Sequence, residues 1–135
     1  MSRPVLLDTC ALIWMIDDGK ITREAEAALA EAEPGGLVVS PISAWEIGLL
    51  ASRGRLFLSV EPRDWFRQAL DAGLTLAPMP PEVLIASSFL PGNSLRDPSD
   101  RIIAATARAF RYRLMTRDRP LLDFAEAGHV EAIAC

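Results

Sequence analysis

Val5-Leu6-Leu7-Asp8 is the stretch that decides the fold. Three consecutive apolar residues without alternation predict a short strand buried on both faces, which is typical of a parallel sheet. The aspartate that ends the run places a charge at the edge of the core, and a buried carboxylate is costly unless it is paired or bound to a metal. The same pattern returns late in the chain, where Leu114-Met115-Thr116 precedes Asp118.

Strand-like and helix-like segments alternate outward from this stretch. Such alternation predicts an α/β fold with a parallel or mostly parallel central sheet and helices on both faces. No internal repeat or long linker divides the chain, so we expect a single domain over residues 1–135. Further strands are predicted over 37–39, 74–77, 113–116 and 130–134, helices over 11–16, 22–33, 40–53, 62–72, 81–89, 97–110 and 120–127, and an ambiguous apolar segment over 56–60.

The composition indicates a globular cytoplasmic protein. Half of the 135 residues are hydrophobic and 24% are charged. No apolar run approaches the length of a membrane-spanning helix, and we see no signal peptide, so no membrane association is expected. The two cysteines, Cys10 and Cys135, have no metal-type spacing and are expected to be reduced thiols.

Charge is unevenly distributed along the chain. A net charge of −4 argues against a broad surface for nucleic acid. Residues 96–119 nevertheless hold seven arginines against three acids, a local balance of +4, which leaves −8 for the remainder. This segment is either a solvated helix face or a phosphate-binding rim beside an acidic centre.

Glu46 lies in the middle of an apolar helix face. At about 100° per residue, Ile42 and Trp45 lie on one side of it and Leu50 on the other. We therefore expect its carboxylate to face the interior or a cleft. Pairing with Arg53 or Arg55 is the alternative, although buried ion pairs are weak stabilisers.

The two acids around Pro98 have different expected roles. Asp97 precedes the proline as an N-cap residue would, and Asp100 then falls where an acid can complete a capping box. Asp100 is also in register with Ile103 and Ala104 on one helix face. We assign Asp97 to capping and Asp100 to a pocket. Asp8 and Asp118 have capping as their alternative role, because aspartate after a strand often caps the next helix.

Taken together, the four acids predict a metal centre. In parallel sheets, ligands bind at the carboxyl ends of the strands near a topological switch point, where Asp8 and Asp118 are expected. Oxygen ligands without a histidine or cysteine cluster favour Mg²⁺ or Mn²⁺. The predicted catalytic and metal-binding residues are Asp8, Glu46, Asp100 and Asp118.

Other chemistries find little support. His129 is the only histidine and is expected to be structural, and no glycine-rich dinucleotide or phosphate loop exists. Cys10 is expected to be a small core residue at a helix start. The tryptophans are expected in the core or at an interface: Trp14, Trp45 and Trp65.

These residues give the chain a family resemblance. It resembles a PIN-domain ribonuclease, most of all a VapC-type toxin of bacterial toxin–antitoxin pairs. The segments that carry the resemblance run nearly end to end and are 5–9, 11–14, 39–47, 96–105 and 114–118. The chain departs from many relatives in having Asn93-Ser94-Leu95 where they have a histidine, and Ser99 where an aromatic residue is frequent. This departure concerns RNA positioning and leaves the carboxylates intact.

The resemblance implies a function and partners. It implies Mg²⁺-dependent cleavage of RNA phosphodiester bonds, with Asp8 and Asp100 as direct ligands and Glu46 and Asp118 completing the site directly or through water. It also implies a homodimer and an inhibitory antitoxin. The alternatives are an inactive PIN scaffold that binds partners and a phosphoryl-accepting receiver domain, which would want a lysine near the late strands, whereas the only lysine is Lys20.

An apolar surplus suggests where the antitoxin binds. Leu56-Phe57-Leu58, Trp65-Phe66 and Trp14 exceed what one small core is expected to bury. They predict a groove for an amphipathic helix of the partner, from which a basic side chain could reach the carboxylates. Core or homodimer contacts are the alternative.

Overall fold

One sheet of parallel strands forms the centre of the molecule. A computed structural model describes residues 3–17 and 19–135 of the chain. Within these ranges, the order of the five strands is β3-β2-β1-β4-β5, and all of the neighbouring pairs are parallel. The strands are β1 (Val5–Leu7), β2 (Leu37–Val39), β3 (Thr75–Leu76), β4 (Arg113–Thr116) and β5 (Ala132–Ala134).

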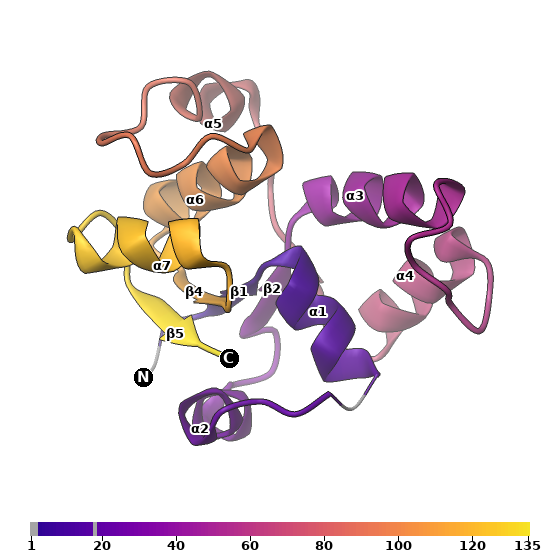
Figure 1. Ribbon diagram of the computed structural model, residues 1–135. Helices are drawn as coiled ribbons and strands as arrows, with labels where there is room; N and C mark the ends of the chain where they lie inside the picture. The colour runs from indigo at the N-terminus through magenta and orange to yellow at the C-terminus, as the bar shows by residue number, and fades with distance from the viewer. Residues whose placement is uncertain (1–2, 18) are drawn as a thin grey trace.

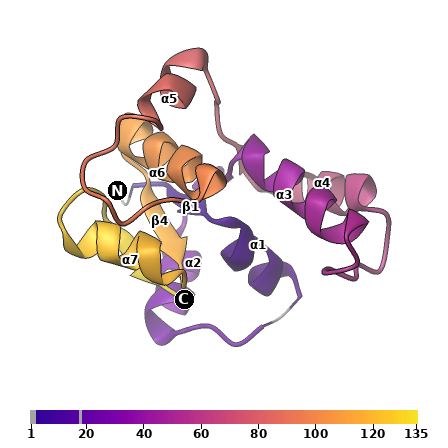
Figure 2. The same cartoon turned by 45° about the horizontal axis from the view of Figure 1, so that its top comes forward.

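Helices cover both faces of the sheet. Figure 1 shows α6 and α7 on one face and α1 and α2 on the other, while α3 and α4 stand together to one side. Figure 2 shows α5 lying on α6, away from the sheet. The described helices are α1 (Thr9–Ile16), α2 (Arg23–Glu31), α3 (Pro41–Ser52), α4 (Pro62–Asp71), α5 (Pro81–Ala86), α6 (Pro98–Phe110) and α7 (Arg119–Glu126).

The central strand β1 explains the two-layered core. Its residues Val5 and Leu7 point into one apolar cluster, with Leu12 and Ala25 of the helices on that face. Leu6 points into the other cluster, together with side chains of α6 and α7. Because successive strand side chains alternate between faces, a strand covered on both sides must be apolar throughout. The three residues of β1 are fully buried, as the sequence predicted.

Three strands run directly into helices at the carboxyl edge of the sheet. Asp8 caps α1 after β1, Ser40 caps α3 after β2, and Asp118 caps α7 after β4. A short polar side chain at this position accepts a hydrogen bond from a backbone N–H that the first helical turn leaves without a partner. The chain thus places polar and acidic groups at one edge of an apolar sheet.

Each predicted strand and helix is present, but several are shorter than predicted: the helix expected over 81–89 ends at Ala86, and the strand expected over 130–134 begins at Ala132. Residues 56–60 form the loop between α3 and α4 and adopt neither helix nor strand. The strand expected over 74–77 is shorter, Thr75–Leu76. Among the described helices, none has the length and apolarity needed to span a bilayer.

The end of α6 has an unusual backbone. Arg111 has φ 58° and ψ 38°, and it is the one non-glycine residue with positive φ in the described parts of the chain. Glycine usually takes this left-handed position, since a side chain there costs roughly 1–2 kcal/mol. The intrinsic backbone preference of arginine therefore does not explain why this residue stands at the left-handed position.

Candidate active site

The candidate site lies where the strand order reverses. β2 and β3 lie on one side of β1, and β4 and β5 lie on the other, so β1 and β4 flank the switch point. Asp8 follows β1 and caps α1, and Asp118 caps α7 two residues after β4. Ligands of open parallel sheets bind at this position. The structure thus brings two of the predicted site residues to the expected edge.

Asp8 is the buried member of the site. Its carboxylate is 4% exposed and accepts hydrogen bonds from the backbone N–H of Ala11 and from the hydroxyl of Thr116. Burial raises the pKa of Asp8 to about 6, against the hydrogen bonds from Thr116 and Ala11, which lower it; the charges of Asp118 and Glu46 add to the rise. Burial thus disfavours the charged carboxylate of Asp8 more than its two hydrogen bonds stabilise it.

Asp100 has the most strongly raised pKa at the site. It is half-buried in the first turn of α6. Burial raises its pKa to about 8, and the negative charges of Asp118, Asp97, Glu46 and Asp8 contribute in that order. All of the other predicted site residues therefore act on one carboxyl group. Asp97 caps α6 through the N–H of Ser99, which confirms its predicted capping role; the pocket role of Asp100 stays a prediction.

Glu46 is held by a pair of hydroxyl groups. Thr9 Oγ1 donates to Glu46 Oε1, and Thr9 Oγ1 and Ser43 Oγ are 2.8 Å apart. A hydroxyl has a single proton, so Ser43 donates to Thr9 while Thr9 donates to Glu46. No ion pair links Glu46 to Arg53 or Arg55 among residues 3–17 and 19–135.

The apolar face predicted for α3 was wrong in its position. Trp45 is 58% exposed, whereas Ser43 and Ile47 are buried. The buried stripe therefore runs beside Glu46 and does not surround it. The reason is that α3 packs on α4, α6 and α1 at one side of the sheet, so its apolar residues are divided between the core and the surface. Trp14 is also 38% exposed, and only Trp65 of the three is in the core, at 5%.

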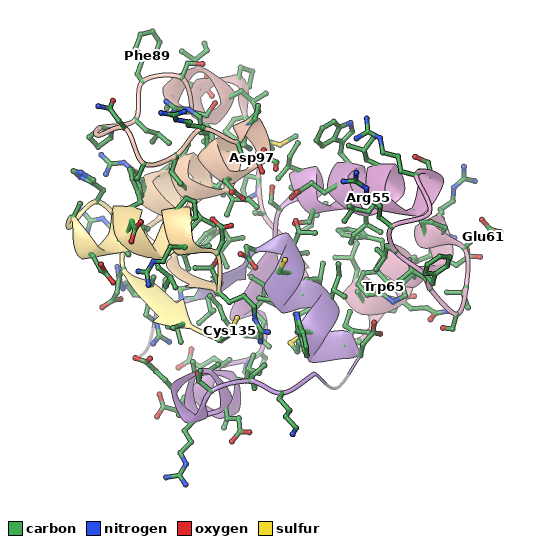
Figure 3. All side chains as sticks on the ribbon, viewed as in Figure 1. Arg55, Glu61, Trp65, Phe89, Asp97 and Cys135 are labelled. Carbon is green, nitrogen blue, oxygen red and sulfur yellow. The ribbon has the colours of Figure 1, made fainter. Side chains whose placement is uncertain are left out.

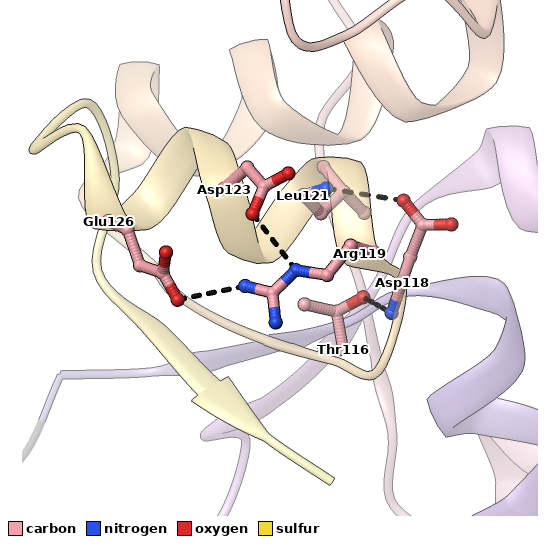
Figure 4. Close-up of polar contacts among 6 residues, drawn as sticks. All are labelled: Thr116, Asp118, Arg119, Leu121, Asp123 and Glu126. Atoms are coloured by element: carbon pink, nitrogen blue, oxygen red, sulfur yellow. Dashed lines mark hydrogen bonds and ion pairs between the residues drawn. The ribbon is translucent and has the colours of Figure 1, made fainter.

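Asp118 takes the capping role considered for it, while its role in a metal site stays a prediction. Its carboxylate accepts the N–H of Leu121 at 3.2 Å, and its own N–H donates to Thr116 Oγ1 at 3.0 Å (Figure 4). Thr116 in turn donates to Asp8, so one threonine joins the two strand-end acids. Figure 4 shows Arg119 turned along α7 toward Asp123 and Glu126, with which it pairs at 2.9 and 2.8 Å.

The hydroxyl residues at the site were not predicted. All three are buried: Thr9 donates to Glu46, Thr116 donates to Asp8, and Ser43 bonds to the hydroxyl of Thr9. Thr9 directly follows one acid and Thr116 shortly precedes another, so adjacency was the available signal. Threonine is also common in strands and helix starts, and this residue type alone therefore carries little functional information.

Most arginines of the 96–119 segment are engaged in structural contacts. Arg101 donates to the carbonyls of Ser87 and Leu95, and Arg117 donates to Lys20 and lies 4.2 Å over the Trp14 ring. These contacts hold loops to the core, so this part of the segment is neither a solvated face nor a phosphate rim. Cys10, expected in the core, is exposed.

The donor types fit a hard divalent cation. Carboxylate oxygens are the preferred ligands of Mg²⁺ and Mn²⁺, and a cation among these acids would relieve their mutual repulsion. As the side chains lie, no three of the His, Cys, Asp and Glu residues in the described ranges are gathered closely enough to hold a metal ion. The four-carboxylate centre thus rests on residue type and charge coupling, and it stays a prediction.

The fold and the candidate site together define the class of protein: an α/β fold with acidic residues at the switch point of a parallel sheet. Residues 5–127 match the PIN domain family, and the chain therefore belongs to that family.

Relatives support the same assignment. The chain is 33% identical over 118 residues to Ribonuclease VapC22 of Mycobacterium tuberculosis, covering 87% of this chain and 88% of that protein. It is also similar to a toxin–antitoxin complex from Klebsiella pneumoniae, at 26% identity and a TM-score of 0.63, covering 93% and 94% of the two chains. VapBC2 from Rickettsia felis, bound to a DNA fragment from its promoter, shares the fold at 14% identity and a TM-score of 0.63, covering 96% and 98%.

Proposed function

We propose that this chain is a cytoplasmic endoribonuclease that hydrolyses RNA with Mg²⁺ or Mn²⁺, as the toxin of a toxin–antitoxin pair. The observation that carries the proposal is the position of Asp8 and Asp118 at the switch point of the sheet, with Glu46 and Asp100 near enough for the charges of neighbouring acids to raise the pKa of Asp8 and of Asp100. The similarity to a protein named as a ribonuclease supports RNA as the substrate. Helix capping would account for Asp8 and Asp118 in an inactive scaffold, but it does not account for Glu46.

The chain's own residues prepare the site for this reaction. Thr116 and the N–H of Ala11 hold the Asp8 carboxylate in one orientation, and Thr9 does the same for Glu46. Asp8 and Asp100 would be direct ligands, with Glu46 and Asp118 completing the site directly or through water. A bound divalent cation lowers the pKa of a water molecule and neutralises charge that develops on the phosphate. Hydroxyl groups that fix the acids keep the site ready for that cation.

RNA cleavage by the purified protein tests the proposal. Cleavage of a total-RNA substrate is expected with Mg²⁺ or Mn²⁺ and is expected to stop with excess chelator. Asp8→Asn, which keeps the size and the capping ability of the side chain, is expected to be inactive at any metal concentration. Cleavage that persists in excess chelator would falsify the metal requirement, and full activity of Asp8→Asn would show that a contaminant or another site is responsible.

The proposed partners are an antitoxin and a second copy of this chain. The antitoxin is supported by the similarity to the Klebsiella complex. The homodimer is supported by exposed apolar side chains: Ile85 is 64% and Phe89 80% exposed, and Figure 3 shows Phe89 at the outer end of the molecule. Sedimentation equilibrium of wild type and Phe89→Ser is expected to show a dimer that the substitution weakens.

A further inference from the structure

A second polar pocket lies at the other end of α6 from Asp100. It has a volume of about 270 Å³, and its lining includes four side chains that can carry positive charge. From Asp100 to Arg111 the helix rises roughly 16 Å, so this pocket is separate from the acidic site. It lies between the C-terminal end of α6 and the residues that lead into β5. The lining residues that carry the argument are Arg3, Arg108, Arg111, Tyr112, His129 and Glu131.

The cations of this pocket exceed its acids. Glu131 pairs with Arg3, and both are well exposed to solvent, so this pair is weakly held. Arg108 and Arg111 bring two further guanidinium groups. A chain of net charge −4 thus gathers three arginines against one carboxylate in the lining of this pocket.

The arginines are held in place for an external acceptor. Arg108 donates through Nη1 to the carbonyl of His129 at 2.7 Å and lies 6.0 Å from the centre of the Phe124 ring, which leaves its other donors available. Arg111 occupies the left-handed position where glycine is preferred. Cations do stabilise a helix C-terminus, but that stabilisation does not require a strained backbone.

An oxyanion with several acceptor oxygens matches these donors. Phosphate accepts paired hydrogen bonds from guanidinium groups, and Arg is the usual residue for such binding. The exposed Phe110 and the Tyr112 ring, 5.8 Å apart, add an aromatic flank of the kind that accompanies bound nucleic-acid strands. Near the acids, by contrast, Arg101 and Arg119 are already engaged within the protein.

We propose that this pocket binds a backbone phosphate of the RNA strand, away from the bond that is cut. The inference rests on the proposed ribonuclease function and makes it more specific: the preferred substrate is an RNA long enough to reach both ends of α6. The strand is anchored by arginines at the distal pocket while another of its phosphates lies at the acids.

Binding of a labelled 20-nucleotide single-stranded RNA, measured at several salt concentrations in chelator, tests the pocket. Arg111→Gly removes the charge and suits the left-handed backbone, so the melting temperature is expected to stay the same or to rise. RNA binding is expected to weaken several-fold, and the slope of log affinity against log salt to become shallower by about 0.7, as for one lost phosphate contact on a single strand. Arg67→Gln, an exposed arginine of α4 on the opposite side of the molecule, is the control and is expected to leave slope and affinity unchanged.

The outcomes separate the pocket from the catalytic proposal. Equal salt slopes of RNA binding for wild type, Arg111→Gly and Arg67→Gln would overturn the proposal that the pocket binds RNA. An equal loss of RNA affinity in both variants would overturn it as well, because it would indicate that binding depends on charge spread over the surface. Inorganic phosphate that raises the melting temperature of wild type but not of Arg111→Gly, with equal RNA binding by the two, would assign the pocket to free phosphate and overturn the RNA proposal. An Arg111-dependent slope in a protein that cuts no RNA with Mg²⁺ would uphold the pocket and contradict the ribonuclease function.

Discussion

Asp100 links the acidity of the site to the stability of the protein. Its pKa is 3.8 in an unperturbed chain and about 8 in the fold. Between these pH values the unfolded chain releases a proton that the folded chain keeps, so this group lowers the free energy of unfolding as pH rises from about 4 to about 8. Asp100→Asn is therefore expected to stabilise the metal-free protein above pH 8, by about 1–2 kcal/mol after allowance for solvent screening. The same variant is expected to lose RNA cleavage. Thermal unfolding at pH 5 and pH 8.5 checks the sign, because the gain should be small at the lower pH.

Asp97→Ala is the matched comparison for Asp100→Asn. Asp97 is exposed and caps α6, and loss of an N-cap costs on the order of 1 kcal/mol. Activity of the folded protein should be retained. If Asp97→Ala abolished cleavage in a fully stable protein while Asp100→Asn cut RNA normally, the two roles would be reversed.

At the scale of a single element, α7 depends on the acid that the site also uses. Asp118→Asn keeps an oxygen that can accept the N–H of Leu121, whereas Asp118→Ala does not. We expect the asparagine variant to fold with near wild-type stability and to lose most cleavage, and the alanine variant to lose cleavage and about 1 kcal/mol of stability. Urea unfolding and cleavage by the same preparations separate the two effects. Equal stability of both variants would mean that the cap contributes nothing.

The elements show how far sequence reasoning reached. The N-terminal ends of α6 and α7 were predictable from the sequence, because Asp97-Pro98 and Asp118 are local N-cap signals that do not depend on the rest of the fold. Which side of α3 is buried was not predictable, because apolar residues surround that helix and its neighbour α4 decides which of them reach the core. The two threonines that hold Asp8 and Glu46 were missed for a related reason. Their partners lie 108 and 37 residues away along the chain.

The distribution of exposed aromatic residues over the whole molecule makes the antitoxin proposal testable. Trp65, one of the residues first assigned to the groove, is buried, whereas Phe57 is 86% and Trp14 38% exposed. Phe57 lines a hollow of about 360 Å³ between α3 and α4. We expect the antitoxin to place apolar side chains on this surface and a basic side chain at the acids. Phe57→Ser is expected to weaken the complex at least tenfold with little change in stability, as for a central interface residue.

Co-expression with the product of the neighbouring reading frame provides the measurement. Trp65→Ala is the control for packing, and it is expected to cost about 3–5 kcal/mol of stability because it empties a core position. Absence of any stable complex, together with undiminished RNA cleavage when that product is added, would contradict the antitoxin proposal. A complex of unchanged affinity with Phe57→Ser would place the partner elsewhere on the surface.

The position of β1 between β2 and β4 has a consequence for how the protein is made. β1 is synthesised first, yet its second neighbour, β4, begins only at Arg113. Until the ribosome has added that strand, Asp8 lacks its hydrogen bond from Thr116, and Asp118 does not yet exist. Non-local strand pairing also forms late in folding. We therefore expect that a nascent chain cannot cut the messenger or the ribosome that is making it, and that inhibition becomes necessary only once the chain is released.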